Sequence, residues 1–299
     1  MKILLLGSQG QVGTELSRAL LPLGEVQAWS RQDADLSDPA ALAANLAGVC
    51  ADVIVNASAY TAVDKAETDS ATAFAVNGDA VACLAQHATA QGALLVHYST
   101  DYVFDGTKQG SYLPDDVCAP LSVYGKSKRQ GEEAILASGC DTLVLRTSWV
   151  YSVHGGNFIK TVLRLAAERK ELGMVADQWG APTSAEFIAD VTADAILARR
   201  GGRLASGIHH LTAAGRTNWC ELARYVVARA QAQGLTLRAS PERIRAIRTQ
   251  DYPLPAPRPR NSSLAYGPLA DALDLQFPEW PVYVNRVVDQ LCRQLVSQS

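Results

Sequence analysis

Short apolar runs alternate with longer segments of helical spacing over the first two thirds of the chain. The apolar runs have the length of strands and cover residues 2–6, 25–29, 52–56, 93–98, 142–147 and 208–212. The segments between them have the composition and spacing of helices and cover residues 14–21, 39–47, 70–90, 126–137, 157–170 and 184–199. This alternation is typical of right-handed strand–helix–strand units. We therefore predict an α/β fold with a parallel sheet and helices on both faces.

The last third of the chain has a different pattern. Helices are predicted near residues 218–233 and 282–295, and a proline-rich tract, residues 253–260, lies between them. We expect this tract to be extended and exposed. Its arginines, with those just upstream, either hold phosphate oxygens of a substrate or form a solvated basic face. The arginines concerned are Arg243, Arg245, Arg248, Arg258 and Arg260.

Length and composition restrict the class of protein. A chain of 299 residues forms one large or two modest domains. A net charge of −3 gives no support for nucleic acid or an anionic membrane as partner. No apolar run reaches the roughly 18 residues needed to span a bilayer. The six cysteines are scattered without a C-x-x-C pair, which favours reduced thiols, and we expect a cytoplasmic protein.

The first candidate site follows the first apolar run. Gly7, Gly10 and Gly13 form a G-x-x-G-x-x-G pattern between a predicted strand and a predicted helix. Glycines at such a turn let the backbone approach a diphosphate, which binds the N–H groups of the helix start. An ordinary strand-to-helix turn is the alternative. The position after the N-terminal strand favours a dinucleotide site.

The second candidate site is a tyrosine–lysine pair. Tyr124 and Lys128 lie four residues apart on a predicted helix and therefore share one face. An ammonium beside a phenol is expected to lower the tyrosine pKa toward neutrality. Such a tyrosine can give a proton to a carbonyl oxygen. Most copies of Y-x-x-x-K occur by chance on protein surfaces, so the pattern gains weight only from the glycine loop.

The third candidate site is the polar end of the apolar run 93–98. Ser99, Thr100 and Asp101 come where a parallel strand would present ligand-binding groups. A hydroxyl here could bind the same carbonyl oxygen as Tyr124. Because side chains alternate along a strand, only Ser99 or Thr100 can face the site. A simple turn or helix cap is the alternative.

Glycine spacing and Y-x-x-x-K together resemble the short-chain dehydrogenase/reductase superfamily. Longer motifs are similar to the dTDP-4-dehydrorhamnose reductases; they lie at residues 56–67, 98–106, 123–128, 146–151, 177–183 and 258–262. The resemblance implies a Rossmann-type domain and a smaller, C-terminally derived α/β substrate domain. We expect residues 1–150 in the dinucleotide-binding domain, with about 184–212 returning to it. Residues 151–183 and 213–299 would form the nucleotide-sugar domain.

The resemblance also implies roles for individual residues. Thr100 would polarise the sugar carbonyl, Tyr124 would donate the proton, and Lys128 would bind the nicotinamide ribose and tune Tyr124. The chemistry implied is reduction of the C4 ketone of dTDP-4-dehydro-β-L-rhamnose. The implied cofactor contacts are Gly10, Gln11 and Val12 at the diphosphate, Asp35 and Leu36 at the adenine, and Ala59, Tyr60 and Thr61 along the ribose and nicotinamide. The implied substrate contacts are Thr100, Asp101, Trp149 and Arg258, although a tryptophan after a strand is more often core packing.

Cofactor choice depends on the end of the second strand. Ser30 and Arg31 stand there, with no acidic residue before Asp33, which favours NADPH and leaves NADH use open. Glu15 and Glu186 match acidic positions that some relatives place at a metal-containing dimer interface. The matching C-terminal region has no glutamate, so we predict no metal, while a homodimer stays open.

Four alternatives remain. A 4,6-dehydratase would follow its Thr-Asp with a glutamate, whereas Tyr102 follows Asp101 here. A C4 epimerase and a reductase of a related deoxy-hexulose are not excluded by the sequence. A non-catalytic subunit, like the regulatory subunit of methionine adenosyltransferase that resembles this family, would be free to lose Thr100, Tyr124 or Lys128. Their retention favours an enzyme that makes activated rhamnose for cell-surface polysaccharide such as O-antigen.

Overall fold

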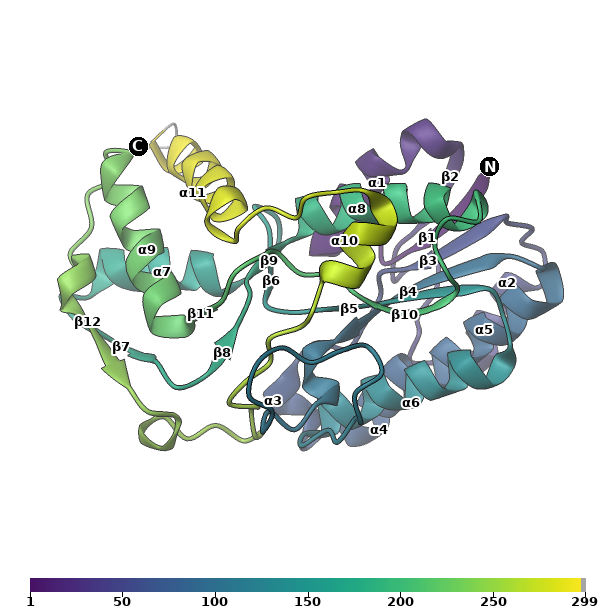
Figure 1. Cartoon of the computed structure of the whole chain (residues 1–299), viewed down its shortest axis with the longest axis horizontal. Coiled ribbons are helices and arrows are strands. Elements are labelled where there is room, and N and C mark those ends of the chain that lie inside the picture. Colours follow the sequence, from purple (N-terminus) through teal and green to yellow (C-terminus); the bar gives the residue numbers. More distant parts are fainter. Residues whose placement is uncertain (297–299) are drawn as a thin grey trace.

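The computed structural model describes residues 1–296, and its centre is a six-stranded parallel sheet (Figure 1). The strand order is β10-β5-β4-β3-β1-β2. The strands are β1 (Lys2–Leu6), β2 (Glu25–Trp29), β3 (Val53–Asn56), β4 (Leu94–Thr100), β5 (Thr142–Thr147) and β10 (Gly207–His210). The predicted parallel α/β fold is confirmed. Strand β4 continues two residues beyond the predicted end, so that Thr100 is its last residue.

Helices cover both faces of the sheet, as Figure 1 shows. On β1, Ile3 and Leu5 point into one core and Leu4 and Leu6 into the other, as the two-residue period of a strand requires. The first face is covered by α1 (Gln11–Ala19), α8 (Ala185–Arg200) and α10 (Gly267–Leu273). The second face is covered by α2 (Pro39–Leu46), α5 (Ala80–Gln91) and α6 (Val123–Ser138). The short helix α3 (Val63–Ala66) follows β3.

The predicted helix over residues 70–90 is interrupted. It begins as α4 (Ser70–Phe74), passes through a π-helical turn, Ala75–Asp79, and continues as α5. Within the turn, Asn77 bonds the backbone N–H and carbonyl of Tyr60 and the Ser127 hydroxyl. The turn also lies close to α6, because a Cβ on Gly131 would be 2.2 Å from the Asn77 carbonyl oxygen. Such turns are frequent at functional sites. Here the turn connects α6 to the loop after β3.

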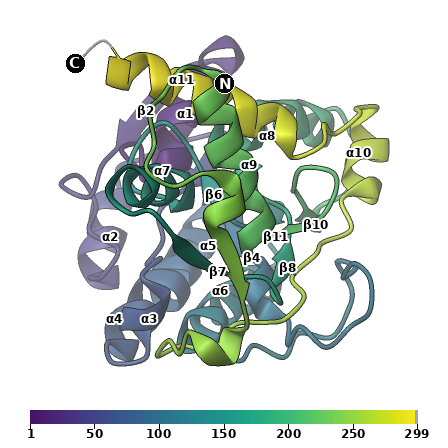
Figure 2. The same ribbon diagram turned by 90° about the vertical axis from the view of Figure 1, so that its left-hand side faces the viewer.

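A second hydrophobic core lies beside the sheet (Figure 2). Its helices are α7 (Phe158–Glu168), α9 (Trp219–Ala232) and α11 (Pro281–Val296). Three small two-stranded sheets accompany them. These pair β7 (Leu172–Val175) with β12 (Ile244–Ile247), β8 (Trp179–Gly180) with β11 (Thr217–Asn218), and β6 (Val150–Tyr151) with β9 (Thr183–Ser184).

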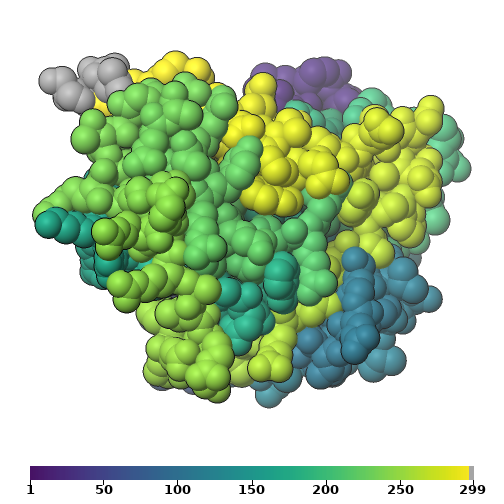
Figure 3. Space-filling view, turned by 60° about the vertical axis from the view of Figure 1, so that its left-hand side comes forward, coloured from purple at the N-terminus to yellow at the C-terminus, as the bar shows by residue number. Residues whose placement is uncertain are grey.

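The proline-rich tract is exposed only in its first part, so the expectation of an exposed segment is wrong from Ala256 onward. Ala256 and Pro259 are buried. A Cβ on Gly106 would lie 2.6 Å from Arg260 N, which shows how closely the tract packs on the segment after β4. Figure 3 shows yellow-green and yellow atoms of the C-terminal third against blue atoms of that segment. The tract therefore runs between the two hydrophobic cores. Within residues 1–296, no helix is long and apolar enough to cross a bilayer.

Candidate active site

The glycine loop has the geometry of a diphosphate-binding turn. Gly7 has φ +77°, and a Cβ on Gly13 would lie 2.0 Å from the Gly7 carbonyl oxygen, so both positions require glycine. Helix α1 begins after Gly10 with no side chain capping its first N–H groups. These N–H groups and the positive end of the helix dipole suit a negatively charged ligand. The loop fits the diphosphate of a dinucleotide.

A cavity of about 480 Å³ joins this loop to the candidate catalytic residues. Lining residues come from the glycine loop, the loop after β3, the end of β4, α6 and the segment after β5. Of the residues proposed from the sequence, those lining this cavity are Gly10, Gln11, Val12, Ala59, Thr61, Thr100, Asp101, Tyr124, Lys128 and Trp149. Those lying elsewhere are Gly7, Gly13, Ser30, Arg31, Asp35, Leu36, Tyr60 and Arg258. Three distant parts of the sequence therefore meet at one site.

Local contacts fix the start of α6, where Tyr124 lies. The Ser122 hydroxyl caps the helix by accepting the Gly125 N–H at 3.1 Å. Glu67 accepts the Val123 N–H at 2.9 Å. Gly125 allows close packing, because a Cβ there would lie 2.3 Å from the Tyr102 carbonyl oxygen. Tyr124 is thereby held in the first turn of the helix, beside the end of β4.

The expected effect of Lys128 on Tyr124 is wrong. Burial raises the pKa of Tyr124 to about 12, against the opposing effect of a hydrogen bond with Thr100. Lys128 instead donates to the Tyr98 carbonyl oxygen at 2.6 Å and lies 3.1 Å from His97 Nε2. Burial lowers the pKa of Lys128 to about 8, and the charge of Glu132 opposes this shift. A phenol with a high pKa stays protonated at neutral pH, which is the state needed to give a proton.

Thr100 connects Tyr124 to a buried carboxyl group. Its hydroxyl donates to Asp101 Oδ1 at 2.9 Å and accepts the Tyr102 N–H at 3.1 Å. Burial raises the pKa of Asp101 to about 7, although hydrogen bonds from Ser262 and Thr100 oppose the shift. Thr100 rather than Ser99 therefore contacts Tyr124, and Asp101 is poised to change charge near neutral pH.

Two tryptophans form a wall of the site. Trp149 has φ 48°, a left-handed conformation that is uncommon for a bulky residue. Its ring stacks on Trp219, with ring centroids 3.6 Å apart and planes 11° apart. Trp219 Nε1 donates to Gln178 Oε1 at 3.2 Å. Sequence reasoning missed Trp219; its position directly after the Asn218 helix cap was the only available signal.

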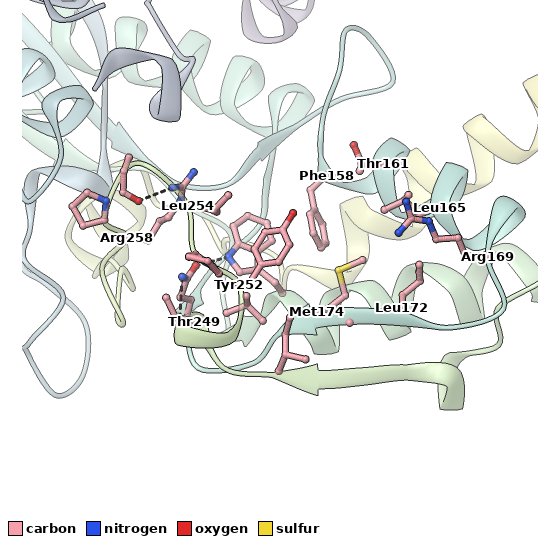
Figure 4. Close-up of a pocket in the computed structure, with 18 of the residues that line it drawn as sticks. Phe158, Thr161, Leu165, Arg169, Leu172, Met174, Thr249, Tyr252, Leu254 and Arg258 are labelled. Atoms are coloured by element: carbon pink, nitrogen blue, oxygen red, sulfur yellow. Dashed lines mark hydrogen bonds between the residues drawn. The ribbon is translucent and has the colours of Figure 1, made fainter. Parts of the chain in front are cut away.

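A second cavity of about 570 Å³ adjoins the first, because Tyr102 and Trp219 line both. It lies between α7, β7 and the tract after β12 (Figure 4). Tyr252 and Leu254 lie toward Arg258, whereas Leu165, Arg169 and Leu172 lie at the far end. Sequence reasoning missed every lining residue except Arg258. The others come from separate segments with no motif in common.

The structure separates the arginines that the sequence grouped. Arg243 and Arg245 pair with Glu171 at 2.9 and 2.8 Å, and Arg248 pairs with Asp251 at 3.3 Å. Arg258 lines the second cavity, and its guanidinium donates to both oxygens of Asp64 at 2.6 and 2.7 Å. Of these four arginines, Arg258 is the one placed to meet a ligand in that cavity.

Comparisons with known proteins agree with this geometry. A family described as the RmlD substrate binding domain matches residues 1–293. A dTDP-4-dehydrorhamnose reductase of Burkholderia thailandensis is 46% identical over 302 residues, covering 100% of both chains. The chain belongs to the dTDP-4-dehydrorhamnose reductase family. The resemblance found in the sequence motifs is thus confirmed.

Solved structures of the dTDP-4-dehydrorhamnose reductase family superpose closely on this chain. One from Clostridium acetobutylicum has a TM-score of 0.89 and 31% identity, covering 97% of this chain and 99% of the other. One from Bacillus anthracis, in complex with NADP, has a TM-score of 0.88 and 28% identity with the same coverage.

In this family member, the end of β2 carries charges of both signs. The Ser30 N–H and hydroxyl donate to Asp33 Oδ2 at 2.8 and 2.7 Å. Arg31 is 80% exposed and pairs with Asp35 at 3.1 Å. Leu36 is buried in the core that covers this face of the sheet. The arginine therefore stands at the surface with an acidic residue on each side.

The two glutamates noted at the α1–α8 face have protein partners. Glu186 pairs with Arg286 at 2.6 Å, and Glu15 lies 3.8 Å from Arg18. Burial, and then the charge of Glu186, raise the pKa of Glu15. In the part of the chain that the structure describes, no group of three or more His, Cys, Asp or Glu side chains is arranged to hold a metal.

Proposed function

We propose that this protein reduces the C4 ketone of dTDP-4-dehydro-β-L-rhamnose to dTDP-β-L-rhamnose with NADPH. The observation that carries the proposal is the Tyr124 phenol beside the Thr100 hydroxyl, on the wall of the cavity that the glycine loop enters. The names of the relatives support the substrate. The NADP complex of the Bacillus anthracis relative supports the cofactor.

The protein's own residues position the ketone and supply the proton. Bound NADPH would provide the hydride that is added to C4. Thr100 and Tyr124 would both bind the ketone oxygen, and Tyr124 would give it a proton as the C4–H bond forms. The carbonyl thus gains one hydride and one proton and becomes the alcohol. Because burial holds its pKa at about 12, Tyr124 is protonated before the reaction.

We propose that the two cavities divide the ligands between them. The first would hold the nicotinamide and the sugar, and the second the nucleotide part of the substrate. Trp149 and Trp219 would pack on the substrate where the cavities meet. Arg258 would bind the substrate diphosphate, as its planar fork suits phosphate oxygens.

The same division supports the proposed domains. Residues 1–150 and about 184–212 would bind the dinucleotide, and residues 151–183 and 213–299 the nucleotide sugar. Residues 297–299 of the last segment lie outside the described residues. We further propose that NADPH is preferred through Ser30 and Arg31, that NADH is also accepted, and that the product serves cell-surface polysaccharide such as O-antigen.

The deciding experiment follows NADPH oxidation with dTDP-4-dehydrorhamnose generated in the cuvette, beside Tyr124→Phe. Wild type should oxidise NADPH and form dTDP-rhamnose. The variant keeps the ring and should still bind NADPH, which fluorescence measures, but should lose at least about a hundredfold in kcat because the proton donor is gone. No oxidation by a folded wild type that binds NADPH would contradict the proposal. Interconversion of sugar epimers without net oxidation would identify an epimerase instead.

A further inference from the structure

His97 lies in the middle of β4 and is fully buried, yet both of its ring nitrogens face polar side chains. Nδ1 is 3.1 Å from Asn56 Nδ2 on β3, and Nε2 is 3.1 Å from Lys128 Nζ on α6. Asn56 and His97 are direct register partners in the sheet, so strand pairing fixes their contact. The ring therefore connects the sheet to the helix that carries Tyr124.

The hydrogen bonds around Asn56 determine which nitrogen of His97 carries the proton. Asn56 Oδ1 accepts the Ser58 N–H at 3.0 Å, so the Asn56 NH₂ group faces His97 and donates to Nδ1. Burial, and then the charge of Lys128, hold the pKa of His97 well below its ordinary value, which keeps the ring neutral. A neutral ring whose Nδ1 accepts must carry its single proton on Nε2.

The Nε2–H group then faces Lys128 Nζ. An ammonium has no lone pair and cannot accept this hydrogen bond, whereas a neutral amine can. The Tyr98 carbonyl oxygen, 2.6 Å from Nζ, accepts from either form. The arrangement around His97 therefore favours the neutral amine over the ammonium.

Other groups near Lys128 act in different directions. Glu132, one turn further along α6, favours the ammonium, and its carboxylate is bound by Arg146 of β5. The remaining ionisable groups nearby are Tyr98 on β4, Asp101 in the 3-10 turn after β4, and Tyr124 on α6 itself. The π-helical turn packed against α6 contributes Asn77, which is uncharged and bonds Ser127.

We propose that Asn56 and His97 act as a positioning pair for Lys128. Asn56 selects the tautomer of His97, and His97 fixes the place of Nζ and the balance between its charged and neutral forms. This inference rests on the proposed function only for its effect on turnover. The geometry of the pair is independent of the substrate.

Two replacements of His97 separate positioning from simple packing. In His97→Gln the amide reaches the place of Nε2, and its oxygen can accept from the ammonium. In His97→Asn the amide stays near the place of Nδ1 and bonds Asn56, but nothing reaches Lys128. The asparagine variant is therefore the matched control, because it keeps the contact with the sheet and loses the contact with the helix.

The direct readout is the titration of the Lys128 Nζ group by ¹⁵N NMR in the cofactor-free protein, assigned with Lys128→Arg. His97→Gln should raise the titration midpoint by about one pH unit and move the basic limb of the kcat profile upward with it. His97→Asn should lower kcat by about tenfold through loss of positioning, and His97→Gln should recover most of that loss. Melting temperatures report any general damage, which would lower both variants alike.

Equal Lys128 midpoints in wild type and His97→Gln would overturn the proposal, and so would full kcat with a wild-type pH profile in a folded His97→Asn. If the asparagine variant does not fold, the glutamine variant alone carries the test. The NMR titration needs no substrate. A shifted midpoint in proteins that never oxidise NADPH would leave the positioning pair standing and remove the proposed function.

Discussion

Asp64 and Arg258 form a two-pronged ion pair across 194 residues of sequence, with guanidinium–carboxylate distances of 2.6 and 2.7 Å. Asp64 also accepts the Ala256 N–H at 3.1 Å, so one carboxylate holds the proline-rich tract on α3. The hydrogen bonds from Arg258 lead the effects that hold the pKa of Asp64 below its usual range. The pair places a largely buried arginine on the second cavity.

Arg258→Gln tests the role of this arginine. The variant keeps a polar group but loses the charge and the fork, so the KM for the nucleotide sugar should rise by about tenfold or more. The dissociation constant of NADPH should not change. Arg245→Gln is the matched control, because Arg245 is 70% exposed and pairs with Glu171. Equal KM values in the two variants would show that Arg258 does not bind substrate.

The end of β2 gives a prediction about cofactor choice. Arg31→Gln should raise the dissociation constant of NADPH by up to about fivefold, since exposed charge pairs contribute about 1 kcal/mol or less. Asp33→Asn should lower it, because it removes a negative charge near the expected 2′-phosphate. Neither change should affect NADH. Fluorescence titrations with both cofactors at low and high salt check the signs, and parallel changes for NADPH and NADH would contradict the assignment.

Asp101 makes stability depend on pH. Its pKa rises from 3.8 to about 7 on folding, mainly through burial, so the folded state binds this proton more tightly than the unfolded state. The stabilisation is therefore complete below pH 4 and is lost as pH rises toward 7. Asp101→Asn is neutral at every pH. Its free energy of unfolding relative to wild type should increase by on the order of 2 kcal/mol between pH 5 and pH 8. Urea unfolding of both proteins at the two pH values measures this, and a constant difference would refute the buried-acid interpretation.

Arg146 and Glu132 form a buried pair with two contacts of 2.8 Å. Their side chains are 1% and 0% exposed, and Arg146 also donates to the Pro114 carbonyl oxygen at 3.0 Å. Glu132→Gln leaves the buried guanidinium without a counter-charge and should cost about 3–5 kcal/mol in the free energy of unfolding.

Arg129→Gln is the matched control for this pair. Arg129 contacts the same carboxylate at 3.0 Å but is 27% exposed, so its replacement should cost about 1 kcal/mol or less. Denaturant unfolding monitored by circular dichroism compares the two variants. Equal losses would mean that burial does not set the strength of the Glu132 contacts.

The sequence alone determined the parallel sheet, the glycine loop and the Tyr124–Lys128 helix. These features depend on local rules. Strand and helix periods are read over a few residues, and Gly7 and Gly13 are required by the close approach of neighbouring backbone. The position of Thr100 at a strand end also followed from the apolar run before it, although the structure extends β4 by two residues.

Tertiary structure alone decided how these groups behave. Spacing placed Lys128 near Tyr124, but the packing of α6 on β4 turned its ammonium toward Tyr98 and His97, and burial raised the pKa of Tyr124. Trp219 and the second cavity were invisible in the sequence because their segments meet only when the two cores form. Desolvation and contacts between distant residues arise only when the whole chain folds. A local pattern can name a reactive side chain, and the folded environment sets its charge and its partners.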